Sequence, residues 1–258
     1  MMNNASITNE NNSNITPEPT NTASPAVILD ALVAPTSLFN QFTAAKKWSW
    51  LALFLLMAVT FISTMVFFDN MSLPWLIEQQ LLEAGELSAS EVEGTKAMIE
   101  QIAEYTGLIS ATFTVISLLI MNAIFAGYYL LITKITDKKS SGKNTEKFVF
   151  SDWYSFSVWT QMPLLINTLG FSLLLITAAT NDLPLSLINY ASLNQLVLGL
   201  TPNNSLYMWA ESFNLFYIWT IFIASIGLKK CANLSLSKAS LIAALPYIIV
   251  FGFWFMAI

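Results

Sequence analysis

Long apolar segments without charge are the feature that most constrains what this chain folds into. Residues 48–68 and residues 107–133 contain no charged side chain. A helix needs about 20 apolar residues to cross the hydrocarbon core of a bilayer. Only 10% of the chain is charged, against about 25% in an average soluble domain. These segments predict an all-α, polytopic membrane helix bundle.

Five segments approach the length of a membrane-spanning helix, so we expect about five transmembrane helices. Prolines at 184 and 202 flank a shorter stretch, 185–200, which we interpret as an interfacial or re-entrant segment; a sixth span is the alternative. The predicted spans are 48–68, 107–133, 159–178, 210–228 and 239–258.

The region before the first span divides into two parts. Residues 1–25 are rich in Asn, Ser, Thr and Pro, so we predict a disordered polar tail. A short amphipathic helix is expected to follow on the membrane surface, because Ile28, Leu32 and Phe39 fall near one face, with a break at Pro35. The membrane domain is expected to cover residues 26–258.

Lysines predict the orientation, because short loops rich in lysine face the cytoplasm. With the N-terminus inside and five crossings, ten of the 11 basic residues, all lysines, fall inside; only Lys96 falls outside. The acidic segment 69–105, which we expect to form a helical hairpin, then lies outside. The lysine-rich loop 134–152 lies inside, and the C-terminus faces outward.

The residue inventory argues against the common catalytic and metal sites. The chain has no histidine and one cysteine, Cys231, which excludes a His-Glu-x-x-His zinc site, a cysteine zinc cluster and a histidine base. The predicted spans contain no Asp for an aspartyl protease. The net charge of −5 does not suggest nucleic acid as a partner. We therefore expect no enzyme, no cofactor and no metal, with the lipid bilayer as the main partner.

Small and neutral polar residues inside the spans are the candidate functional positions. They suit helix packing and interhelical hydrogen bonds, or else the lining of a path for a neutral or lipidic solute. Ionisable groups, which ion-coupled carriers usually keep in the membrane, are absent from the span interiors. The candidates are Asn122, Ala123, Gly127, Gln161, Pro163, Asn167, Asn214 and Gly227.

The lysines near the span ends also have two interpretations. They set the orientation of the chain, or they contact anionic lipid head groups or an acidic protein partner. The candidates are Lys134, Lys138, Lys139, Lys143, Lys147, Lys229 and Lys230.

Three parts of the chain carry a resemblance to a known family. The segment 28–39 places a proline before an aromatic residue. Residues 154–157 (Tyr-Ser-Phe-Ser) precede 162–165 (Met-Pro-Leu-Leu), and the segments 213–219 and 224–228 lie before a short basic turn. In these features the chain resembles the Yip (Ypt-interacting protein) family of five-span membrane proteins, and most closely its bacterial branch.

This resemblance implies a non-enzymatic adaptor, scaffold or membrane organiser in the bacterial cytoplasmic (inner) membrane. A membrane or cytoplasmic protein is then the expected partner. Eukaryotic members of the family bind prenylated Rab-type GTPases, and we do not carry that GTPase partner over to this chain. A carrier or channel for a neutral or lipidic substrate is the alternative.

Overall fold

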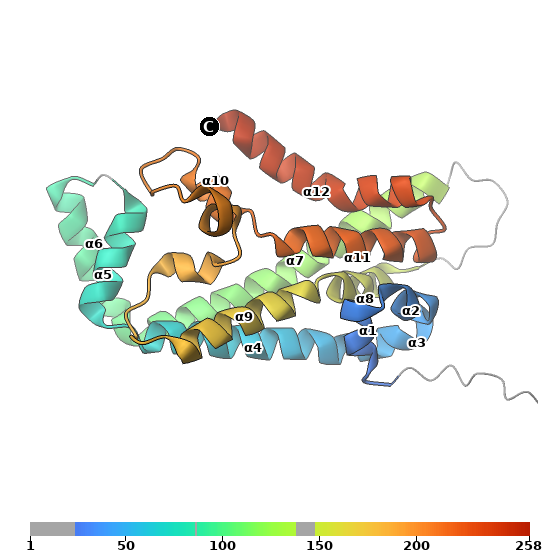
Figure 1. The fold of residues 1–258 in the computed structure, drawn as a ribbon, viewed down its shortest axis with the longest axis horizontal. Coiled ribbons are helices and arrows are strands. Elements are labelled where there is room, and N and C mark those ends of the chain that lie inside the picture. The colour runs from blue at the N-terminus through green and yellow to red at the C-terminus, as the bar shows by residue number, and fades with distance from the viewer. Residues whose placement is uncertain (1–23, 86, 138–147) are drawn as a thin grey trace, which may run out of the picture.

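The computed structural model describes residues 24–85, 87–137 and 148–258, which fold into helices with one isolated β-bridge, between Ser192 and Asn214 (Figure 1). The all-α prediction is confirmed. Residues 1–23 of the predicted tail lie outside the described residues. The candidates Lys138, Lys139, Lys143 and Lys147 also lie outside them.

Three helical stretches are long and apolar enough to cross a membrane, and they contain most of three predicted spans. Their main helices are α4 (Ser49–Asp69), α7 (Thr106–Asp137) and α12 (Leu236–Ala257). The stretches extend into neighbouring short helices, η1 (Lys46–Trp48) before α4 and η2 (Ala103–Tyr105) before α7. The count of about five crossings stays a prediction.

The third predicted span, 159–178, is wrong as a single helix. The chain forms α8 (Phe150–Thr160) and α9 (Pro163–Thr177), which meet at a bend of 41° and together have the length and composition of one crossing. Pro163 is the first residue of α9. Proline has no N–H to donate to the preceding turn, so a helix begins at it readily and continues through it poorly.

The fourth predicted span, 210–228, is also interrupted. It divides into α10 (Tyr207–Ser212) and α11 (Phe216–Cys231), and α11 has only 16 residues. The backbone between them pairs with another segment: Leu193 N–H donates to the Phe213 carbonyl at 2.8 Å, and Leu215 N–H donates to the Ala191 carbonyl at 3.0 Å. These bonds replace the ones that would have continued the helix.

The stretch 185–200 contains no helix long enough for a sixth span. It forms η3 (Leu185–Asn189) and η4 (Asn194–Leu198), each of five residues. Between them, residues 191–193 lie against the interruption that precedes α11.

A line of side-chain hydrogen bonds joins α4 to α8–α9 and shows the relative direction of the two segments. Ser49 donates to Ser155 at 3.0 Å, the hydroxyls of Thr60 and Thr168 are 3.5 Å apart, and those of Ser63 and Ser172 are 2.6 Å apart. The sequence separation stays between 106 and 109 residues along this line, so the two segments run parallel. The helix between them in sequence, α7, therefore runs back in the opposite direction (Figure 1).

The bundle has two unlike ends (Figure 1). The N-terminal helices, the C-terminal end of α7 and the turn between α11 and α12 lie at one end. Lysines belong to this end, since Lys134 is in the last turn of α7, and Lys229 and Lys230 are in the last turn of α11. The acidic helices α5 (Leu73–Ala84) and α6 (Ala89–Ile102) lie at the other end.

The predicted amphipathic helix corresponds to three short helices, α1 (Val27–Val33), α2 (Pro35–Asn40) and α3 (Phe42–Ala45). The break at Pro35 is confirmed. Placing their apolar face on lipid was wrong, because Phe39 and Phe42 are buried against Phe156 of α8, with ring centroids 5.3 and 6.2 Å apart. Protein surface, rather than the bilayer, covers this face.

Candidate functional site

One group of buried polar side chains lies at the bend between α8 and α9. The Ser157 hydroxyl donates to Asn122 Oδ1 at 3.0 Å and accepts from Gln161 Nε2 at 3.2 Å. Asn122, which is 0% exposed, also donates to the Leu118 carbonyl at 3.0 Å. These bonds satisfy both polar atoms of the Asn122 amide and join α7 to the bend.

A second group lies farther along α9. Asn214 Nδ2 donates to Asn167 Oδ1 at 3.4 Å, and the Tyr190 hydroxyl donates to the Asn167 carbonyl at 3.1 Å. Tyr190 lies over Gly170, where an added Cβ would collide with its hydroxyl. The four polar candidates therefore form two separate pairs, Asn122 with Gln161 and Asn167 with Asn214.

The small-residue candidates differ in their packing. A Cβ on Gly227 of α11 would lie 2.5 Å from Phe156 Cε2 and 2.7 Å from Phe39 Cζ, so this glycine is required for the contact between α11, α8 and α2. Gly127 has no atom within 4 Å of such a Cβ, and Ala123 is only partly buried. Within the described part of the chain, no neighbouring helix therefore approaches Gly127 closely, whereas the pairing of two small residues predicts such an approach.

Sequence reasoning missed a buried carboxylate at the acidic end. Glu211 of α10 is 4% exposed and accepts hydrogen bonds from Ser192 Oγ at 2.9 Å, from Asn194 Nδ2 at 3.3 Å and from Gln195 Nε2. We call these four residues the Glu211 cluster. Its one sequence signal is that Glu211 is the only acidic residue in a predicted span.

Tyr207 connects this end of α10 to the acidic hairpin. Its hydroxyl donates to Glu83 Oε1 of α5 at 3.3 Å. Burial raises the pKa of the Tyr207 phenol, and the nearby carboxylates of Glu83 and Glu211 raise it further. The phenol therefore stays protonated and remains a donor. The Glu211 cluster and Tyr207 are built to fix loop 190–200 and the hairpin in place.

The lysine-bearing end contains one ion pair among the described residues, between Lys46 Nζ and Asp152 Oδ1 at 2.8 Å. The three described lysine candidates, Lys134, Lys229 and Lys230, are exposed. They come from two helices, α7 and α11, whose C-terminal ends share this end of the bundle (Figure 1).

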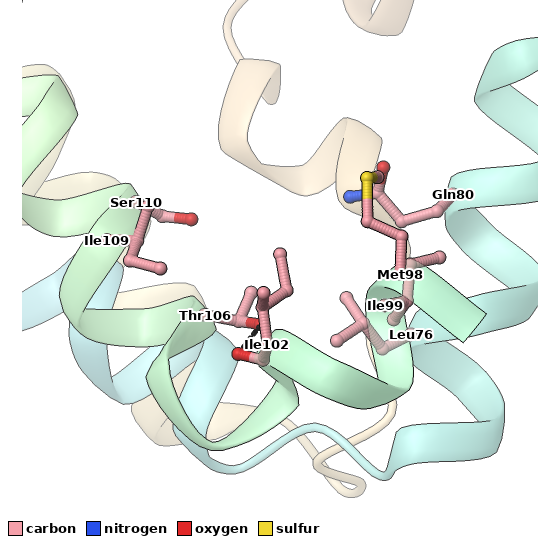
Figure 2. A pocket seen from close by; sticks show the side chains of 8 residues that line it. All are labelled: Leu76, Gln80, Met98, Ile99, Ile102, Thr106, Ile109 and Ser110. Carbon is pink, nitrogen blue, oxygen red and sulfur yellow. Dashed lines mark hydrogen bonds between the residues drawn. The ribbon is translucent and has the colours of Figure 1, made fainter. Parts of the chain in front are cut away.

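A pocket of about 160 Å³ lies where α5 and α6 meet the start of α7 (Figure 2). Its wall is mainly apolar, with an amide and two hydroxyls, and no ionisable side chain lines it. It is separate from both polar groups of the bundle. The lining residues are Leu76, Gln80, Met98, Ile99, Ile102, Thr106, Ile109 and Ser110.

Comparison with known proteins agrees with this architecture. The family model of the Yip1 domain matches residues 29–258, which is almost the whole described helical region. No curated protein and no solved structure matches the chain. Within the described residues, no three His, Cys, Asp or Glu side chains are grouped to hold a metal ion.

Because the family model covers most of the chain, the chain belongs to the Yip family, a non-enzymatic family of membrane proteins.

Proposed function

We propose that this chain is a scaffold or membrane organiser of the bacterial branch of the family, which holds a protein partner at its lysine-bearing end. One observation carries the proposal: three buried polar side chains, from α7, α8 and the bend after α8, bond to one another. In Asn122, Ser157 and Gln161 the polar groups join α7 to the bend of α8–α9. Bonds of this kind stabilise a fixed assembly of helices.

The carrier alternative has less support. A path for a neutral solute needs polar groups around one continuous cavity, whereas the four candidates form two separate pairs. Asn122 and Asn214 use both polar atoms of their amides in bonds to neighbouring groups, so neither is free to bind a solute. A scaffold needs no such path.

The proposed orientation places the N-terminus and the lysine-bearing end in the cytoplasm, and the C-terminus and acidic hairpin outside the inner membrane. Two features support it. The parallel course of α4 and α8–α9 fits alternate crossings through α7. The lysines at the ends of α7 and α11 lie together, as the positive-inside rule requires of one cytoplasmic face.

Site-specific photo-cross-linking in native membranes tests the scaffold role. Val33 of α1 is 80% exposed at the lysine-bearing end, and Leu82 of α5 is 52% exposed at the acidic end. A photoreactive amino acid at Val33 is expected to give a discrete adduct with one protein, identified by mass spectrometry. The same amino acid at Leu82 is the matched control. Recovery of the same bulk membrane proteins from both positions would contradict the proposal.

A further inference from the structure

Five lysines at one end of the bundle are exposed and have no ion pair among the described residues. Lys46 differs, because Asp152 neutralises it at 2.8 Å. We call the five the basic collar. They are Lys47, Lys134, Lys229, Lys230 and Lys238.

The packing of α7, α11 and α12 places four of the five lysines at a similar height along the long axis of the bundle. The Tyr128 hydroxyl of α7 donates to the Ile242 carbonyl of α12 at 2.7 Å. Lys134 follows Tyr128, and Lys238 precedes Ile242, each by one to two helical turns, so both lie about 6–9 Å beyond this bond toward the same end. Lys229 and Lys230 are in the last turn of α11, immediately before the turn into α12.

An exposed indole relates this level to the membrane. Trp50 is 64% exposed in the first turn of α4, one turn after Lys47. Tryptophan prefers the head-group level of a bilayer, with its ring in the apolar boundary. Lys47, one turn before Trp50, is therefore expected near the phosphates, where a lysine stem reaches along apolar surface and its ammonium enters the polar layer.

We propose that the basic collar binds the phosphate groups of anionic phospholipids in the adjoining leaflet. The lysines come from separate elements, η1, α7, α11 and α12, and so face several head groups rather than one concave site. The opposite, acidic end has no comparable group of lysines, because α5 and α6 together contain a single lysine, Lys96. The inference is independent of the scaffold role, since lipid contact requires no protein partner.

Lipid retention by the full chain tests the collar. The protein is purified from nanodiscs of phosphatidylglycerol and phosphatidylcholine, and retained lipids are counted by native mass spectrometry. Each lysine near an anionic surface changes binding by about fivefold. In the triple variant K134Q/K229Q/K230Q, the ratio of retained phosphatidylglycerol to phosphatidylcholine is therefore expected to fall at least about tenfold. K134R/K229R/K230R is expected to retain it, and K96Q is the matched control at the acidic end.

Three results would overturn the inference. The first is equal retention of the two lipids by the unmodified chain, and the second is a triple glutamine variant that keeps the full preference. The third is displacement of phosphatidylglycerol by inorganic phosphate alone, which would identify a free-phosphate site. If the glutamine variant does not fold, KCl titration of the unmodified chain decides: the preference must fall as salt rises. A salt-independent preference would also overturn the inference.

Discussion

Replacing Gly227 by leucine is expected to prevent isolation of a folded, monodisperse protein. Even the Cβ of Gly227→Ala would lie 2.5 Å from Phe156 Cε2, 2.9 Å from Phe156 Cζ and 2.7 Å from Phe39 Cζ. Both rings are buried and pack on each other, with centroids 5.3 Å apart, so neither moves freely. Overpacking of this kind costs about 1–3 kcal/mol, which is the loss expected for Gly227→Ala. Leucine adds a whole side chain to the same space.

Gly127→Ala is the matched control for this prediction. Gly127 is also a glycine within a helix, α7, but its added Cβ meets nothing within 4 Å. Alanine is favoured over glycine in a helix by up to about 1 kcal/mol, so stability should stay equal or rise slightly. Thermal unfolding in detergent measures both variants. Equal melting temperatures for Gly227→Ala and Gly127→Ala would refute the packing of α2, α8 and α11 described above.

Glu211→Ala is expected to release the loop 190–200 from α10. The carboxylate accepts hydrogen bonds from Ser192, Asn194 and Gln195. Without it, Asn194 keeps its bond to the Leu200 carbonyl and the exposed Gln195 can bond to water, so the buried Ser192 hydroxyl is the donor that loses its partner. A buried donor without a partner costs about 1–3 kcal/mol, which is the local loss expected. Hydrogen exchange of the amides in 191–200 should then accelerate by roughly tenfold to a hundredfold, at about tenfold for each 1.4 kcal/mol.

An exposed glutamate provides the control for Glu211. Glu104 belongs to the same acidic end but is exposed in η2, and no described side chain donates to it. Glu104→Ala is therefore expected to leave the exchange of residues 191–200 unchanged. If Glu211→Ala gave the same protection as Glu104→Ala, the Glu211 cluster would not hold this loop.

Local sequence signals predicted the features that depend on neighbouring residues. The charge-free runs gave α4, α7 and α12, and Pro35 gave the break between α1 and α2. Ser88 and Glu91 form a capping box through similarly local bonds, with Ser88 N–H donating to Glu91 Oε2 at 2.8 Å. Each of these depends on residues within one or two helical turns.

Long-range contacts account for the features that the sequence did not predict. The interruption before α11 depends on backbone bonds to residues 191–193, some 20 residues earlier in the chain. The burial of Phe39 and Phe42 depends on Phe156, because periodicity identifies an apolar face without identifying what covers it. For the same reason Asn122 and Gln161 were found as candidates, while Ser157, which bonds to both, was not.

The proposed orientation is tested most directly by cysteine accessibility in right-side-out membrane vesicles. In a Cys231→Ser background, Lys134→Cys at the end of α7 and Glu93→Cys in α6 each provide one thiol at opposite ends of the bundle. A membrane-impermeant maleimide is expected to label Glu93→Cys in intact vesicles and Lys134→Cys only after the vesicles are opened. Labelling of both thiols in intact vesicles would contradict a bundle that spans the membrane with its lysines inside.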